Sequence, residues 1–150
     1  MENYDAQKAA RVWQRVQNST QGDSDAAVFA AMVAEEQTDA VTYLHLSRRY
    51  QGKEAASLRR LFEEEQSHAA CLKGIYTLIT GQRIPSRSLP TPTEPTGVIL
   101  RRCYGREMRA LAQYESWIGH REYGPVFQRL ARQEQEHCRI LLELLGQLKS

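Results

Sequence analysis

A pattern of glutamate, two intervening residues and histidine occurs twice in the chain, as EQSH at 65–68 and as EQEH at 134–137. Residues three apart on an α-helix lie on one face, with Cβ atoms about 5–6 Å apart, so the carboxylate and the imidazole of each copy can point at one object. Both groups are metal ligands. The pattern therefore predicts a metal ion as the common target.

Each copy lies on an apolar stripe rather than on a polar helix face. Apolar residues recur at steps of three and four on either side of it, as expected for a helix that buries one side. The two stripes are Leu58, Leu61, Glu65, His68, Leu72, Ile75 and Ile79, and Phe127, Leu130, Glu134, His137, Leu141, Leu144 and Leu148. Both helices thus aim a carboxylate and an imidazole into the interior of a helical bundle.

Two further stripes carry one glutamate each, followed seven residues later by a tyrosine. They are Phe29, Val33, Glu36, Ala40, Tyr43 and Ser47, and Leu100, Cys103, Glu107, Ala110, Tyr114 and Trp117. Glu36 and Glu107 are 71 residues apart, and Glu65 and Glu134 are 69 apart, so the two halves of the chain repeat one plan. The repeat predicts two helical hairpins related by an approximate twofold axis.

Four ionised carboxylates on core stripes would each cost several kcal/mol without a partner. Two divalent cations supply about four positive charges against about four negative ones, with both histidines neutral. One Glu-x-x-His on an exposed helix is readily explained by chance, but two copies at matched stripe positions are not. The remaining candidates lie off the stripes, and we interpret them as surface or structural groups: Glu63, Glu64, Glu115, Glu136, Glu143, His45 and His120.

Ferritin-like di-iron and di-manganese bundles have the same set of ligands: one glutamate from each of two helices, and a Glu-x-x-His from each of the other two. Residues 26–80 and 98–148 resemble the erythrin domain of the rubrerythrin family. The matching residues are Glu36 with Tyr43, Glu65 with His68, Glu107 with Tyr114, and Glu134 with His137. The resemblance implies that Glu65 and Glu134 bridge two irons. It also implies that the other ligands are terminal and that both tyrosines hydrogen-bond to ligand carboxylates.

The chain departs from that family at two points. Rubrerythrin has a further glutamate three residues after the ligand of the third bundle helix, and this glutamate exchanges with a histidine when the iron changes redox state. In this chain the position holds Ala110, and the symmetry-related position holds Asp39. We interpret Asp39 as a surface residue; the alternative is that it serves as a substitute ligand. The paired CxxC motifs of a rubredoxin domain are absent from this chain, so the reductant is expected to be a separate protein.

The expected fold is all-α, a ferritin-like four-helix bundle with a short N-terminal helix at 3–18, in one domain over residues 1–150. A turn at 18–25 precedes the first hairpin at 25–80, in which Gly52 ends one helix, at about 51, and Gly81 the next. Four of the five prolines fall within 81–97, which predicts an extended crossover. The second hairpin spans 98–148, with a helix to about 120 and a turn at Gly124.

Composition gives no sign of a nucleic-acid or membrane partner. The net charge is +2, and the arginine pairs at 48–49, 59–60 and 101–102 are typical of solvated helix faces. No apolar run reaches membrane-spanning length, and the N-terminus has no signal-peptide pattern. The three cysteines are too scattered for a disulfide framework or a CxxC site. These features favour a cytoplasmic protein with reduced thiols.

The leading functional hypothesis is a di-iron oxidoreductase that reduces hydrogen peroxide or oxygen. Tyr43 and Tyr114 would orient ligand carboxylates and pass on protons. A ferritin-like ferroxidase or iron-handling protein, a di-manganese catalase-like protein and a metal-free helical adaptor are the alternatives, since carboxylate-rich sites suit iron and manganese alike. We also predict a homodimer, and the long crossover would let it form with or without exchange of hairpins between chains.

Overall fold

Four helices make up the computed structural model, which describes the backbone of residues 2–148 and the side chains of residues 24–148. The helices are α1 (Glu2–Ser47), α2 (Gly52–Thr80), α3 (Thr96–Ser116) and α4 (Gly124–Gly146). No strand occurs within residues 2–148. The prediction of an all-helical bundle is therefore confirmed.

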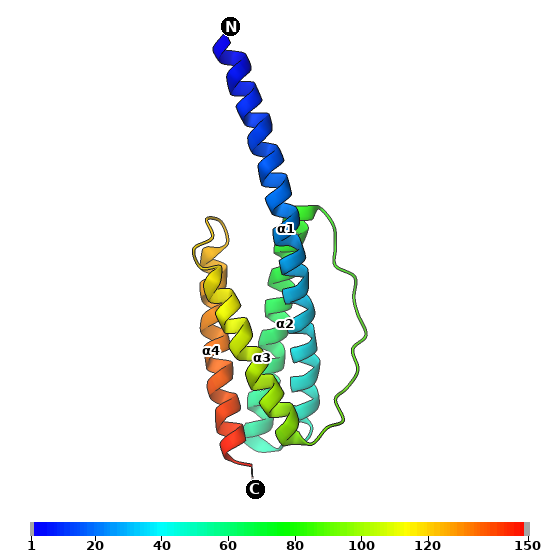
Figure 1. Cartoon of the computed structure of the whole chain (residues 1–150). Coiled ribbons are helices and arrows are strands. Elements are labelled where there is room, and N and C mark those ends of the chain that lie inside the picture. The colour runs from blue at the N-terminus through cyan, green and yellow to red at the C-terminus, as the bar shows by residue number, and fades with distance from the viewer. Residues whose placement is uncertain (1, 149–150) are drawn as a thin grey trace.

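The helices form two antiparallel hairpins, and an extended crossover between α2 and α3 runs along the outside of the bundle (Figure 1). α1 packs along α2 and α3 along α4, while α1 meets α3 and α2 meets α4 across the seam between the hairpins. Both hairpins of one chain thus enclose a common interior. The homodimer, with or without exchange of hairpins between chains, stays a prediction.

The N-terminal part of the chain differs from the prediction. A separate helix at 3–18 and a turn at 18–25 were expected, but α1 is one continuous helix from Glu2 to Ser47. The segment contains no proline, and its one glycine, Gly22, costs a helix only about 1 kcal/mol relative to alanine. The turn-forming side chains of this segment do not stop the helix. How residues 3–18 pack lies outside the described side chains.

Two other helix ends lie a few residues from their predicted positions. Gly52 was expected to end the first long helix, but that helix stops at Ser47, and Gly52, with φ of 62°, is the first residue of α2. α3 ends at Ser116 rather than near 120, because His120 Nδ1 accepts the backbone N–H groups of Glu122 and Tyr123 and organises the turn before α4. The predicted stop at Gly81 is confirmed, with φ of 72° and its N–H donated to Thr77.

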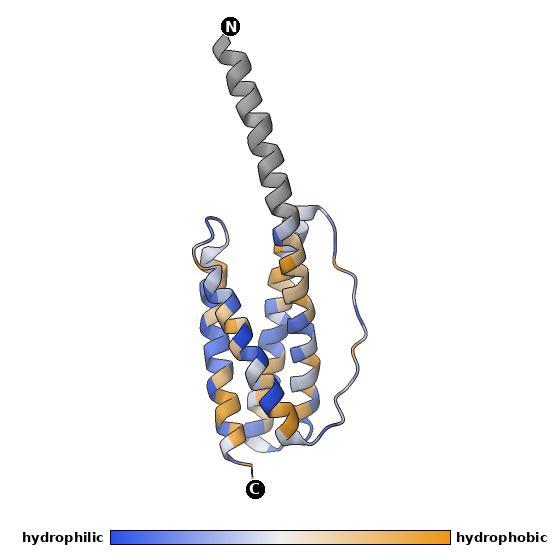
Figure 2. Cartoon of the chain, in the orientation of Figure 1, coloured by the Kyte–Doolittle hydropathy of each residue, from blue (hydrophilic) through white to orange (hydrophobic). Residues whose placement is uncertain are grey.

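The apolar core consists of two clusters separated along the bundle axis by a polar layer. One cluster is Tyr43, Leu46, Leu58, Leu61, Ile99, Leu100, Cys103, Ile140, Leu141 and Leu144. The other is Phe29, Met32, Val33, Leu72, Ile75, Tyr114, Phe127, Leu130 and Ala131. Hydrophobic and hydrophilic positions are interspersed along α2, α3, α4 and the coloured part of α1 (Figure 2). One stripe residue was assigned wrongly, since Leu148 follows the end of α4 and is 39% exposed.

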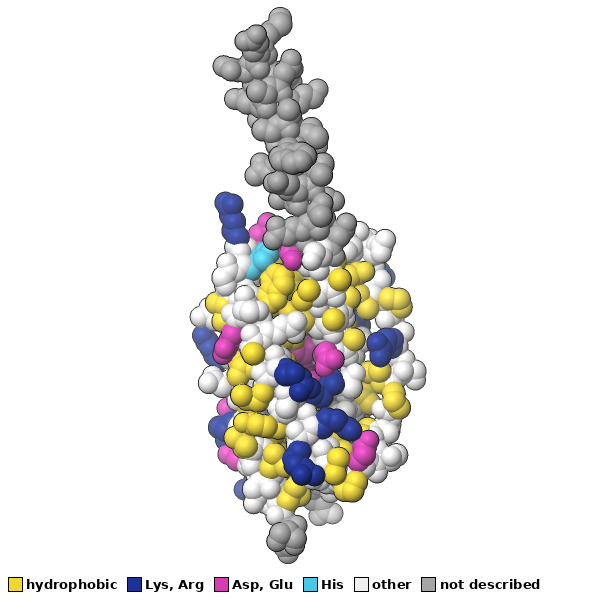
Figure 3. Space-filling view, viewed as in Figure 1, with side chains coloured by type: hydrophobic (Ala, Val, Ile, Leu, Met, Phe, Trp, Pro, Cys, Tyr) yellow, Lys and Arg dark blue, Asp and Glu magenta, His cyan; other side chains and the backbone are white. Residues whose placement is uncertain are grey.

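Basic and acidic side chains are interspersed on the face shown in Figure 3, with hydrophobic side chains between them. All three arginine pairs named above are exposed, as predicted. Among the described residues, none of the helices combines the length and the apolar character that crossing a membrane would require.

Candidate metal centre

The polar layer between the two apolar clusters consists of the six residues that the sequence singled out. They come from all four helices and each is at most 1% exposed: Glu36 on α1, Glu65 and His68 on α2, Glu107 on α3, and Glu134 and His137 on α4. Their burial follows from the stripes, because each glutamate or histidine takes the place of an apolar residue on a core-facing side. The predicted convergence of these residues is confirmed.

The six residues form two overlapping groups, each with three carboxylates and one imidazole. One group is Glu36, Glu65, His68 and Glu134, and the other is Glu65, Glu107, Glu134 and His137. Within each group the candidate ligand atoms all lie within 4.8 Å of one another. Glu65 and Glu134 belong to both groups, so each can offer one oxygen to either side. The arrangement thus has room for two metal ions that share two carboxylates.

Both imidazoles turn Nδ1 toward the carboxylates. His68 Nδ1 lies 2.8 Å from Glu134 Oε1 and 3.6 Å from Glu36 Oε2. His137 Nδ1 lies 2.6 Å from Glu65 Oε1 and 3.5 Å from Glu107 Oε2. The two rings are nearly parallel, with centroids 5.7 Å apart and an interplanar angle of 18°. Each histidine therefore faces the shared glutamate of the opposite hairpin, which is the approximate twofold relation that the repeat predicted.

Several inward-facing polar atoms of the centre make no hydrogen bond of acceptable geometry, although oxygen and nitrogen atoms lie close to one another there. Buried side-chain nitrogen and oxygen atoms are almost always satisfied in folded proteins. Among the described residues nine are not, and eight of these belong to the six residues, the other being the Tyr50 hydroxyl. The eight are Glu36 Oε2, both oxygens of Glu65, His68 Nδ1, Glu107 Oε2, both oxygens of Glu134, and His137 Nδ1. Because these atoms face one another, a pair of divalent cations fits the donor set.

No family model, curated protein or solved structure matches the chain. The donor chemistry of the centre can be described from its own atoms. Carboxylate oxygen with a minority of imidazole nitrogen, and no thiolate, is a set that suits iron and manganese.

Two tyrosines bind the carboxylates of Glu107 and Glu36 across the seam between the hairpins. The Tyr43 hydroxyl on α1 donates to Glu107 Oε1 at 2.6 Å, and the Tyr114 hydroxyl on α3 donates to Glu36 Oε1. Burial raises the pKa of both tyrosines well above the ordinary value, so both stay neutral donors. Each bond leaves the other oxygen of the same carboxylate, Oε2, turned toward the centre.

The outward ring nitrogens of the histidines also have partners, which the sequence reasoning missed. His68 Nε2 lies 2.7 Å from Gln133 Oε1, and His137 Nε2 lies 2.8 Å from Glu64 Oε2. Glu64 was interpreted as a surface charge, which is wrong: its side chain is 21% exposed and contacts the site. The available signal was its position directly before Glu65, which the repeat matches with Gln133 directly before Glu134.

The carboxylates strongly affect the protonation of both imidazoles. Burial alone would lower the pKa of His68, but the carboxylates of Glu134 and Glu36 raise it to about 10. Burial is likewise outweighed at His137, where Glu134 and Glu64 raise the pKa to about 9. Burial raises the pKa of Glu36. In the metal-free protein, protons on Nδ1 thus compensate part of the negative charge that cations would otherwise balance.

Asp39 is not the surface residue that was predicted. It is 3% exposed, and Arg106 on α3 donates its Nε–H to Asp39 Oδ1 at 2.6 Å. Arg106 also contacts the exposed Glu35, at 2.8 Å. Burial raises the pKa of Asp39 to about 7 despite the opposing effect of Arg106. Ala110, the symmetry-related residue, is half-buried and packs against the apolar cluster near Tyr114.

The remaining histidines and cysteines stand apart from the centre. His45 accepts the Nε–H of Arg49 at 3.1 Å, and His120 organises the turn before α4, so both have structural surroundings as predicted. All three cysteines are free thiols. Cys103 and Cys138 are buried, and Cys71 is half-buried.

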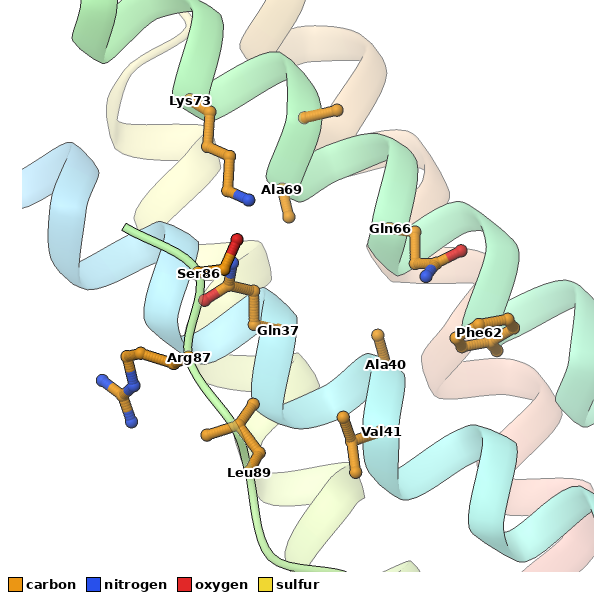
Figure 4. A pocket seen from close by; sticks show the side chains of 11 residues that line it. Gln37, Ala40, Val41, Phe62, Gln66, Ala69, Lys73, Ser86, Arg87 and Leu89 are labelled. Atoms are coloured by element: carbon orange, nitrogen blue, oxygen red, sulfur yellow. The ribbon is translucent and has the colours of Figure 1, made fainter. Parts of the chain in front are cut away.

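Two surface cavities lie near the centre without being lined by any of the six residues. One of about 310 Å³ lies between α1, α2 and the crossover, where Gln37 and Ala40 face Gln66 and Ala69 (Figure 4). The other, of about 270 Å³, lies between α1, α3 and the crossover. The side chains of Asp39 and Arg106 line this second cavity, one helical turn from Glu36.

Proposed function

We propose that the chain is a ferritin-like protein of rubrerythrin type that holds two iron ions at the six-residue centre and reduces hydrogen peroxide or oxygen. The observation that carries the proposal is the pair of overlapping ligand groups that share Glu65 and Glu134. The unpartnered atoms of the same residues support it, because four inward carboxylates without cations would be strongly unfavourable.

Each residue has a distinct role in this proposal. Glu65 and Glu134, which belong to both groups, would be shared by the two metal positions, while Glu36 with His68 and Glu107 with His137 would complete one position each. Tyr43 and Tyr114 would hold the carboxylates of Glu107 and Glu36, and their hydroxyls would relay protons along these hydrogen bonds to a bound oxidant.

Two ferrous ions held by these residues would supply one electron each, which together with two protons would convert one peroxide molecule to two waters. The apolar clusters above and below the centre exclude bulk water from it. The electrons are restored by a separate donor protein.

The proposal is tested by loading the protein anaerobically with ferrous iron, counting the ions bound, and mixing with peroxide in a stopped-flow instrument. Two ions per chain and oxidation within milliseconds to seconds are expected, much faster than free ferrous ion under the same conditions. Glu134→Gln should lose the paired binding, because it removes one shared charge. Glu136→Gln, two residues away on the same helix and paired with Arg139, should behave as the wild type.

Failure to bind a pair of ions, or oxidation no faster than that of free iron, would overturn the proposal. The same material addresses the alternatives. An iron-storage role requires a large closed shell of subunits, which the native mass measures. A catalase-like role requires that manganese is the bound metal and that the protein produces oxygen from peroxide, which metal analysis and an oxygen electrode measure.

A further inference from the structure

The surroundings of the two histidines are related by the approximate twofold but differ in charge. Glu64, directly before Glu65 on α2, contacts His137 of the other hairpin, and Gln133, directly before Glu134 on α4, contacts His68 in the same way. The distances are 2.8 and 2.7 Å. The outward nitrogen Nε2 therefore contacts a carboxylate at His137 and a neutral amide at His68, in otherwise equivalent positions.

A metal ion bound at Nδ1 uses the lone pair there, so the proton of the neutral ring is on Nε2 and is donated outward. A carboxylate acceptor pulls on that proton more strongly than an amide oxygen and makes the ring a better electron donor to the metal. Glu64 also adds a negative charge close to one metal position only.

Other charged groups nearby do not cancel this difference. Arg60 lies 3.5 Å from Glu64 Oε1, but the other oxygen, Oε2, is the one that accepts from His137. Near the opposite position, Asp39 and Arg106 form an ion pair with each other.

We propose that Glu64 and Gln133 make the two metal positions inequivalent, so that the position beside His137 binds a divalent cation more tightly and fills first. Glu64 acts through His137 and is a positioning residue. This inference rests on the proposed function, since it presupposes that the centre binds a pair of cations.

The test uses cobalt(II) titration of the metal-free protein of residues 1–150, with the position of the first ion located by anomalous X-ray diffraction of crystals loaded with one equivalent. Glu64→Gln makes both partners amides and should weaken the first binding constant about tenfold to a hundredfold. The control is Glu63→Gln, which removes the same charge from an exposed neighbour on α2 and should leave the constant unchanged.

The deciding variant exchanges the two residues, Glu64→Gln with Gln133→Glu. Arg129 precedes residue 133 by four, as Arg60 precedes Glu64, so the new carboxylate has an equivalent arginine on its own helix. The exchange should restore the first binding constant and move the first ion to the position beside His68. A purely structural role of Glu64 would give no such rescue and no such relocation.

Two outcomes overturn the inference while leaving the proposed function intact: equal occupancy of both positions in the wild type, or a first binding constant that Glu64→Gln leaves unchanged. Absence of paired cobalt binding in the wild type would instead count against the proposed function. The inference and the proposed function are both supported if the wild type binds two ions with the first beside His137, and if the exchanged variant binds its first ion beside His68.

Discussion

At the scale of single residues, the hydrogen bonds of the tyrosine hydroxyls can be removed without changing the packing of the rings. Tyr43→Phe keeps the buried ring but leaves Glu107 Oε1 without its 2.6 Å donor. An unsatisfied buried acceptor costs about 1–3 kcal/mol, so the unfolding free energy of the metal-free protein should fall by that amount in urea denaturation. Tyr104→Phe is the control, because that half-buried hydroxyl has no protein partner among the described residues. Equal losses in the two variants would contradict the assigned role of the Tyr43 hydroxyl.

At the scale of elements, the turn between α3 and α4 depends on a glycine at its end. A Cβ added at Gly124 would lie 2.3 Å from the backbone oxygen of Ile118, which cannot yield as a flexible side chain would. Gly124→Ala should therefore lower the unfolding free energy by about 1–3 kcal/mol and lower the melting temperature.

A second glycine provides the matched comparison for that turn. Gly74 is exposed within α2, and an added Cβ there meets no atom within 4 Å. Gly74→Ala should raise the unfolding free energy by about 0.5–1 kcal/mol, because alanine loses less backbone entropy in a helix. Thermal and urea unfolding of both variants checks the pair. Stabilisation by Gly124→Ala would show that the turn has a different conformation.

At the scale of the whole molecule, the centre links stability to pH. The pKa of His68 is raised from 6.5 to about 10 and that of His137 to about 9, so the folded metal-free protein binds more protons than the unfolded chain between these values. Its unfolding free energy should therefore be highest below about pH 6.5 and fall by several kcal/mol as the pH rises to about 10. Urea denaturation across this range, in metal-free buffer, measures the slope.

Cations compete with these protons for Nδ1, so binding of a metal pair near neutral pH should release about two protons per chain and tighten as the pH rises. Titrations in buffers of different ionisation enthalpy measure the release. His45→Gln serves as the control, since burial and the neighbouring arginines lower the pKa of His45 and it lies outside the centre. A metal-free protein that becomes more stable from pH 6.5 to 10 would exclude protonated imidazoles at the centre.

Much of this arrangement was readable in the sequence because its signals are local and periodic. A helix buries one side, so a glutamate or histidine on an apolar stripe must point inward, whatever the neighbouring helices do. Glu36 and Glu107, each with a tyrosine seven residues later, and the two Glu-x-x-His copies were found in this way. Gly81 and the prolines after it likewise marked the end of α2 and the crossover, because they act on the backbone directly.

Tertiary structure decided the features that depend on how one helix faces another. Glu64 and Asp39 lie beside the stripes rather than on them, so whether they meet water or a partner depends on the rotation and tilt of the opposing hairpin, which no local period encodes. That packing set Glu64 against His137 and Asp39 against Arg106, and it paired each tyrosine with the glutamate of the other hairpin. The sequence by itself determined which six side chains point inward, and only the packing of four helices determined which atoms support them and with what charge.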